Sequence, residues 1–117
     1  MTANRERVEA MLPLQPAAFH ILLSLSVQDR HGYAIIQDVD ARTAGAVRLS
    51  AGTLYRTVQR LLEDGLISEP RLLAGEDSRR RPYRITPFGR SVARAESNRL
   101  AQLVRLAESA RLLPGSG

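Results

Sequence analysis

The sequence contains no cysteine, no lysine and no tryptophan, and its apolar runs are short. The lack of cysteine excludes disulfide bonds, zinc–thiolate sites and thiol nucleophiles. The most apolar stretch, residues 17–25, is interrupted by His20 and Ser24 and is too short to span a bilayer. Residues 1–12 include Glu6 and Glu9 and have no apolar core like that of a signal peptide. We therefore expect a cytoplasmic protein that does not associate with membranes.

Sequence signatures of enzymes are also missing, because the chain has no G-x-S-x-G motif and no P-loop. A metal site would need both histidines, His20 and His31, together with carboxylates such as Asp29. Simpler roles are expected, with His20 at the edge of a helix and His31 shaping the turn before the next one. At 117 residues and 44% hydrophobic content, the chain fits one folded domain. We expect no enzyme activity, no cofactor and no metal.

The positive charge of the chain is concentrated in two places. All 17 basic residues are arginines, and with 12 acidic residues they give a net charge of +5. Two windows contain no acidic residue at all: residues 48–60 with three arginines, and residues 78–94 with six. A single run of charge is often only a solvated face. Two runs on one surface would instead favour a polyanion such as nucleic acid.

Three short helices are expected in the first half of the chain. Pro16 suits the first turn of a helix over residues 17–27. Its expected buried face consists of Phe19, Leu22, Leu23 and Ser26. A second helix is expected over residues 33–43, with Gly45 at its end. Its expected inner side is formed by Ile35, Ile36 and Val39.

The third helix is expected to have two distinct faces. Ser50 is a good N-cap, and Asp64 and Gly65 end the helix. The buried stripe consists of Leu54, Val58, Leu61 and Leu62. A second face, which is polar, basic and free of carboxylates, consists of Thr53, Arg56, Thr57 and Arg60.

A hairpin and a long helix are expected in the second half. Residues 66–69 and 83–86 favour strands around a polar tip over residues 70–81. Thr86 and Pro87 then start a helix that extends to residue 113. Its apolar positions are Val92, Leu100, Leu103, Val104, Ala107 and Ala110. We expect these six residues to form a dimer interface, because no second core of the monomer is apparent for the helix to cover.

The element order predicts a mainly α fold with a small β-hairpin: a winged helix-turn-helix plus a long C-terminal dimerisation helix. Residues 1–12 would be an extension that is either a short helix or loose. Residues 13–86 would form the winged-helix DNA-binding domain, residues 87–113 the dimerisation helix and residues 114–117 a frayed tail. In a winged helix the third helix and the wing lie side by side, so both arginine clusters would share one surface.

Several short motifs in this order resemble the PadR family of bacterial transcription regulators. They are Phe19-His20-Ile21-Leu22-Leu23, His31-Gly32-Tyr33-Ala34-Ile35, Gly52-Thr53-Leu54-Tyr55, Arg60-Leu61, Glu63-Asp64-Gly65-Leu66-Ile67, Arg79-Arg80-Arg81, Tyr83-Arg84-Ile85-Thr86 and Gly89. The family often has an aromatic residue where this sequence has Pro82, which we expect at a strand edge or bulge. The resemblance is to a short member without the larger C-terminal domain of some relatives.

The resemblance implies a dimeric repressor whose third helix enters the major groove of DNA. The candidate DNA-contacting residues are Ser50, Gly52, Thr53, Tyr55, Arg56, Thr57, Arg60, Arg79, Arg80 and Arg81. The start of the helix favours a phosphate, although Ser50 could merely cap it and Gly52 merely turn the chain. Arg56, and less so Arg60, could contact guanine or phosphate. The wing arginines would contact the backbone or minor groove unless they only solvate a loop.

The sequence does not decide the roles of two tyrosines or whether the protein has a ligand site. Tyr55 either donates to a phosphate or packs under the wing. Tyr33 could touch phosphate, but we expect it in the core. If a small-molecule inducer acts on the protein, we expect Phe19, Tyr33 and the inner face of the long helix to line its pocket in the dimer.

We therefore expect a sequence-specific regulator that binds an inverted-repeat operator in double-stranded DNA as a homodimer. The alternative is a winged helix used only for protein–protein contact. That alternative predicts an apolar or acidic face on the third helix, whereas this face is basic.

Overall fold

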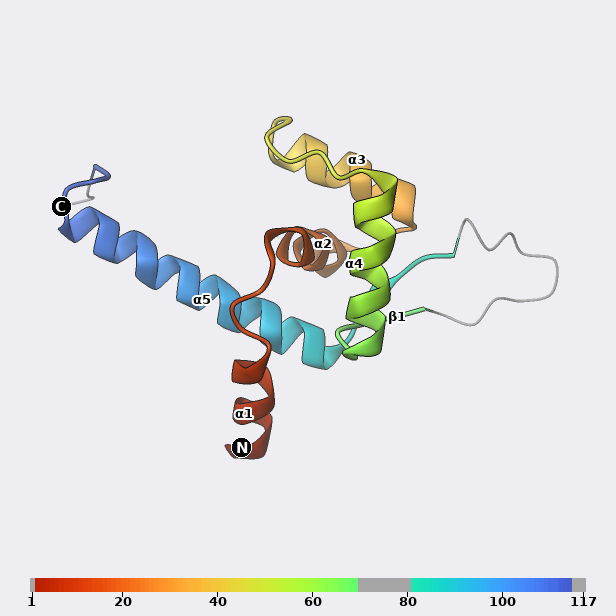
Figure 1. Cartoon of the computed structure of the whole chain (residues 1–117), viewed down its shortest axis with the longest axis horizontal. Helices are drawn as coiled ribbons and strands as arrows, with labels where there is room; N and C mark the ends of the chain where they lie inside the picture. Colours follow the sequence, from red (N-terminus) through yellow and green to blue (C-terminus); the bar gives the residue numbers. More distant parts are fainter. Residues whose placement is uncertain (1, 70–80, 115–117) are drawn as a thin grey trace.

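The computed structural model describes residues 2–69 and 81–114 of the chain (Figure 1). The elements, in order, are α1 (Thr2–Ala10), α2 (Pro16–Val27), α3 (Gly32–Arg42), α4 (Ala51–Glu63), β1 (Ile67–Ser68), β2 (Arg84–Ile85) and α5 (Pro87–Ser109). The mainly helical fold with one small antiparallel sheet confirms the predicted fold class. The first twelve residues, for which a helix or a loose segment was expected, include the helix α1.

Side-chain caps fix where three of the helices begin. The Ser50 hydroxyl accepts a hydrogen bond from the N–H of Thr53 at 3.1 Å, and Thr86 accepts one from Gly89 at 2.9 Å. These two caps were predicted. His31 caps α3 in the same way, because its Nδ1 accepts from the N–H of Ala34 at 3.3 Å. Each such cap typically stabilises a helix by about 1 kcal/mol.

Helix α2 occupies the middle of the core and packs against α3, α4, α5 and β2. The single buried face predicted for it was therefore wrong, since only Leu22 of that set is buried. The residues that α2 buries are Ala18, Ile21, Leu22, Ser24 and Leu25. A helix with neighbours on several sides buries more than one stripe, and a pattern that assumes one solvent-facing side misplaces its core.

Helix α4 behaves as its sequence pattern predicted. Leu54, Val58 and Leu61 are buried, and Leu62 packs partly against the same core. The opposite side of α4 faces solvent. Because this buried stripe fixes the rotation of the helix, it also fixes which polar residues point outward.

The strands β1 and β2 are shorter than the predicted segments 66–69 and 83–86, and a third segment pairs beside them. Ile67 pairs with Ile85 and Ser68 with Arg84 in antiparallel register. The turn between α2 and α3 joins this sheet, because Arg30 and Tyr83 exchange two backbone hydrogen bonds of 3.3 and 2.8 Å. Pro82 lies just before this bridge, outside both strands. The base of the hairpin is thereby fixed to the helical core.

A close joint connects the sheet to α5. The Thr86 hydroxyl donates to the Gly65 carbonyl at 2.7 Å, and the Thr86 N–H donates to the Leu66 carbonyl at 3.1 Å. A Cβ atom on Gly89 would lie only 2.0 Å from the Leu66 carbonyl oxygen. Only glycine at position 89 allows the first turn of α5 to approach the backbone this closely.

The first half of α5 belongs to the core of the protomer, which corrects two expectations. Gly89, Val92, Ala93 and Glu96 are buried there, so Val92 cannot form a dimer surface as predicted. The packing of this half also shows that the helix does cover a core within the monomer. The helix ends at Ser109, four residues earlier than predicted, and the chain then turns through Arg111 at a φ of 61°.

The segment between α1 and α2 is attached to α5 through Glu96. This carboxylate is almost completely buried and accepts a hydrogen bond from the N–H of Leu14 at 3.3 Å. Arg99, on the next turn, donates to the same carboxylate at 2.6 and 2.9 Å. Arg99 lowers the pKa of Glu96, and the N–H of Leu14 acts in the same direction while burial opposes both.

Candidate nucleic-acid interface

The outward side of α4 carries the residues predicted to contact DNA. Ser50, Gly52, Tyr55, Arg56 and Arg60 are exposed, and Thr53 and Thr57 are half-buried. The structure therefore brings together, on one helix, seven of the ten predicted contact residues. No acidic residue occurs in residues 48–60, so Arg56 and Arg60 give this face a positive charge as far as the last turn of α4, where Glu63 is exposed.

The start of α4 is open to a ligand from outside. A Cβ atom on Gly52 would have no heavy atom within 4 Å, so nothing in the described chain covers this position. Ser50 uses its oxygen as the helix cap and its proton in a hydrogen bond to Thr53 Oγ1 at 3.0 Å. The remaining free N–H groups of the first turn point out of the helix, an arrangement that suits an anion.

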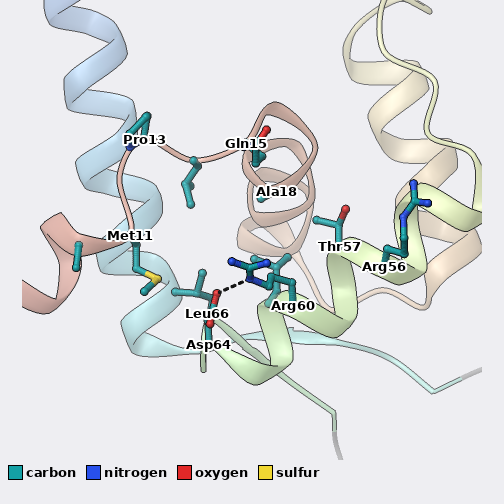
Figure 2. A pocket seen from close by; sticks show the side chains of 12 residues that line it. Met11, Pro13, Gln15, Ala18, Arg56, Thr57, Arg60, Asp64 and Leu66 are labelled. Carbon is teal, nitrogen blue, oxygen red and sulfur yellow. Dashed lines mark ion pairs between the residues drawn. The ribbon is translucent and has the colours of Figure 1, made fainter.

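Arg56 and Arg60 have different surroundings, which Figure 2 shows side by side. Arg56 Nη2 donates to Thr53 Oγ1 at 3.4 Å, a neutral partner. Arg60 is paired with Asp64 at 3.7 Å, although its side chain remains 79% exposed. Exposed i,i+4 pairs contribute little, about 0.3–0.5 kcal/mol. Both guanidinium groups are therefore available to an incoming anion, with Arg56 nearer the start of the helix.

A groove of about 490 Å³ separates this part of α4 from the segment between α1 and α2 (Figure 2). Arg56, Thr57, Arg60 and Asp64 line one side. Apolar side chains of the linker and core line the rest: Ala10, Met11, Pro13, Leu14, Ala18, Leu61 and Leu66, together with Gln15. The groove adjoins the basic face of α4, so Arg56 and Arg60 belong to both the groove and that face.

The expectation for Tyr33 was wrong, and Tyr55 makes a contact that neither of its two expected roles included. Tyr33, which we expected in the core, is 64% exposed, and that expectation was wrong. It directly follows Gly32, which is buried against α4, and the next residue on a helix points about 100° away. The Tyr55 hydroxyl lies only 2.6 Å from where a Cβ on Gly32 would be, so Tyr55 packs over the start of α3 while remaining half exposed.

Acidic residues at and beside the base of the hairpin compensate the charge of two of its arginines. Arg81 contacts the carboxylate of Glu69 across the hairpin, and Arg84 pairs with Asp29 at 2.8 Å. Arg81 was predicted as a DNA contact, but in the free protein its charge is compensated. Burial raises the pKa of the nearby Tyr83 hydroxyl, and Glu69 and Tyr55 act in the same direction.

The tip of the hairpin, residues 70–80, lies outside the described residues, and with it the predicted contacts Arg79 and Arg80. Helix α4 does contact β1, from which the hairpin begins (Figure 1). That placement agrees with the expectation that the third helix and the base of the wing lie side by side.

One exposed residue next to α4 was missed as a candidate. It is Arg48, whose side chain is 77% exposed and whose Nε lies 3.8 Å from Asp40 Oδ1. Its position in the acid-free window just before Ser50 was the signal that could have identified it.

The second half of α5 presents an apolar surface. Leu103, Val104 and Leu106 are between 46% and 57% exposed. Of the other predicted interface residues, Leu100 and Ala107 are half-buried and Ala110 is exposed. Leu106 was not predicted because it falls outside the stripe read from the sequence. This half of α5 projects away from the core of the protomer (Figure 1).

In residues 2–69 and 81–114, no group of three or more His, Cys, Asp or Glu side chains could hold a metal ion. None of the helices described is long and apolar enough to cross a membrane.

Comparison with known proteins identifies similar sequences and folds. Residues 21–95 match the model of the transcriptional regulator PadR-like family. Transcriptional regulator Rv3488 of Mycobacterium tuberculosis is 38% identical over 87 residues, which cover 74% of this chain and 77% of that protein. A transcriptional regulator from Clostridium thermocellum has a similar structure, with a TM-score of 0.69 and 27% identity over 80% of this chain and 87% of its own.

A second similar structure contains nucleic acid. It is Bacillus subtilis PadR in complex with operator DNA, with a TM-score of 0.60 and 18% identity. The match covers 75% of this chain and 48% of that one. At this identity the similarity concerns the fold.

Proposed function

The chain belongs to the PadR-like family of transcriptional regulators, and on that premise we propose that it is a homodimeric repressor that binds an inverted-repeat operator. The family is one of transcriptional regulators and not of enzymes. A regulator of this kind acts where the chromosome is, in the cytoplasm.

The observation that carries the proposal is the outward face of α4. An exposed helix with Arg56 and Arg60 and no carboxylate before position 63 has the shape and charge that the major groove accepts. The fold is shared with Bacillus subtilis PadR in complex with operator DNA, which supports a DNA-binding role.

We assign roles along α4 by position. The open helix start at Ser50 and Gly52 would bind a backbone phosphate through its free backbone N–H groups. Arg56, one turn further, would reach a guanine edge, and Arg60 a phosphate. Arg79 and Arg80 in the wing would contact the backbone or the minor groove. Arg81 would join them only by leaving Glu69.

The second half of α5 supports the dimer. Leu103, Val104 and Leu106 form an apolar surface that the protomer itself does not cover. A two-fold pair of such helices would bury that surface and present two copies of α4. Two like half-sites, with centres about one helical turn or ~10 bp apart, then form an inverted repeat. A dimer bound across a promoter would prevent RNA polymerase from binding there, and transcription would therefore be repressed.

The test is a binding titration on two duplexes, an operator obtained by selection from random sequence and a scrambled duplex. We expect tighter binding to the operator and a steep decrease of affinity with salt on both. Arg56→Ala should lower the operator-to-random ratio by about 5- to 150-fold, the range of one bidentate arginine–guanine pair. Arg5→Ala, in α1, removes the same charge far from α4 and is the matched control.

Two results would contradict the proposal. Lack of binding to any duplex at low salt would favour the alternative, a winged helix that contacts only proteins. A footprint over one asymmetric half-site at saturation would contradict the two-fold arrangement. Transcription in vitro from a promoter carrying the selected operator tests repression, which predicts a decrease as protein is added.

A further inference from the structure

The Arg56 guanidinium donates a hydrogen bond to an uncharged residue, Thr53, and the Thr53 side chain is itself hydrogen-bonded to Ser50. Arg56 Nη2 donates to Thr53 Oγ1 at 3.4 Å, and the same oxygen accepts from the Ser50 hydroxyl at 3.0 Å. Ser50 in turn accepts from the N–H of Thr53 at 3.1 Å. A hydroxyl oxygen has two acceptor positions, so Ser50 and Arg56 together fill those of Thr53. The three side chains form one chain of hydrogen bonds along the first turns of α4.

The neighbouring threonine shows that this arrangement is specific to Thr53. Thr57 is one turn further, but its hydroxyl donates to the Thr53 carbonyl at 2.7 Å, within the helix backbone. That bond uses the proton of Thr57, and among the described residues no arginine donates to its oxygen. Within the described part of the chain, Thr53 is the one hydrogen-bond partner of Arg56.

The neutrality of the partner has a consequence for binding. Arg60 and Arg81 are oriented by carboxylates, which compensate their charge. Thr53 can restrict the rotamers of Arg56 without compensating its charge, so the full positive charge remains available to DNA. Restricting a long side chain before binding reduces the entropy lost when it meets its target.

We propose that Thr53 is a positioning residue that holds Arg56 in the orientation needed to recognise a base. The inference rests on the proposed function, since it names how one residue of the DNA-binding face obtains its specificity. Thr53 acts through Arg56, and Ser50 fixes Thr53.

The experiment compares wild type, Thr53→Val, Thr53→Ser, Arg56→Ala and the double variant Thr53→Val/Arg56→Ala on the selected operator and the scrambled duplex. Valine keeps the size of threonine and the backbone N–H that Ser50 caps, but it removes the hydroxyl. We expect Thr53→Val to lower the operator-to-random ratio by about threefold to tenfold, within the coupling range of contacting residues. Affinity for the scrambled duplex and its salt dependence should not change.

Two comparisons separate positioning from direct contact. Thr53→Ser keeps the hydroxyl and should retain the wild-type ratio. In the Arg56→Ala background, Thr53→Val should have no further effect on the ratio, because the residue it positions is gone. Additive effects of the two substitutions would mean that Thr53 contacts DNA itself, and an unchanged ratio in Thr53→Val or in Arg56→Ala would equally overturn the inference.

A second measurement uses only the wild-type protein, so it does not depend on whether a variant folds. Side-chain ¹⁵N relaxation in the free wild-type protein should show the Nε–H of Arg56 more ordered than that of Arg94, an exposed arginine of α5 with no hydrogen-bond or ion-pair partner among the described residues. Equal mobility of the two would overturn the inference. Failure of the proposed function gives a different result, since wild type itself would then not distinguish the operator from the scrambled duplex.

Discussion

The two halves of α5 belong to one continuous helix of 23 residues, yet they have opposite surroundings. The first half is packed into the protomer through Gly89, Val92, Ala93 and Glu96. The second half leaves Leu103 and Val104 about half exposed. A valine occurs in each half, and only the structure distinguishes the one that completes the core from the one that stays half exposed. An apolar stripe in a sequence therefore predicts that a helix face will be covered, but not by which chain.

The sharpest test of this contrast is one substitution made in both halves. Val92→Asp would place an unpaired charge in the core and should cost about 4 kcal/mol or more, enough to prevent folding. Circular dichroism and urea titration would measure it. Val104→Asp, the matched control, should leave the protomer folded. Comparable loss of structure in both variants would mean that the two halves do not differ.

The next largest effect concerns the dimer. Leu103→Asp together with Val104→Asp should give a folded monomer, because both side chains are outside the protomer core. A monomer contacts one half-site, so operator affinity should fall by about 100-fold or more. Sedimentation gives the mass and fluorescence anisotropy the affinity. An unchanged dimer would remove this half of α5 from the interface.

Glu96 lies between the two halves of α5. Replacing it should have an intermediate effect on the free energy of unfolding. Glu96→Gln keeps the size of the side chain but weakens its bonds to Arg99 and Leu14, which should cost about 1–3 kcal/mol at pH 7. The pKa of Glu96 is lower in the folded protein than its ordinary value of 4.5. Its contribution is therefore fully present above that pH and is lost as the pH falls through the folded pKa.

Urea unfolding of wild type and Glu96→Gln at fixed protein concentration, from pH 7 downward, measures this contribution. The difference in unfolding free energy between the two proteins should shrink as the pH falls below about 4.5. A difference that stays constant with pH would show that the charge of Glu96 does not contribute.

The smallest effect is expected from a charged residue of the second half. Arg105 is exposed and contacts Gln102 of its own helix at 2.8 Å. Arg105→Ala should change the unfolding free energy and dimer dissociation by less than about 0.5 kcal/mol. A larger change in dissociation, measured by sedimentation at several concentrations, would extend the interface to the Arg105 side of α5.

Local signals in the sequence predicted much of the fold. The caps at Ser50 and Thr86 and the two faces of α4 followed from patterns within a few residues. The wrong predictions share a different cause. The buried faces of α2 and the burial of Val92 depend on which elements pack together, and Tyr33 is exposed because Tyr55 covers its neighbour Gly32.

The candidate site was predictable as a surface but not in its details. The acid-free window identified the basic face of α4 without any structure. The window could not show that Glu69 compensates Arg81 or that Thr53 contacts Arg56, because partners depend on the fold. The cap at His31 was missed for a simpler reason, since histidine is not among the usual capping residues.

The joint at Thr86 and Gly89 has a mechanical consequence. Two hydrogen bonds from Thr86 connect the start of α5 to Gly65 and Leu66, which closely follow α4, and no Cβ separates the backbones at Gly89. In a dimer, α5 would act as a rigid lever, about 35 Å long at 1.5 Å per residue. A rotation of one α5 relative to the other would therefore move both copies of α4. The distance between the two copies would then determine which spacing of DNA half-sites the dimer can bind. Spin labels on the two copies of α4 should accordingly give one narrow distance distribution.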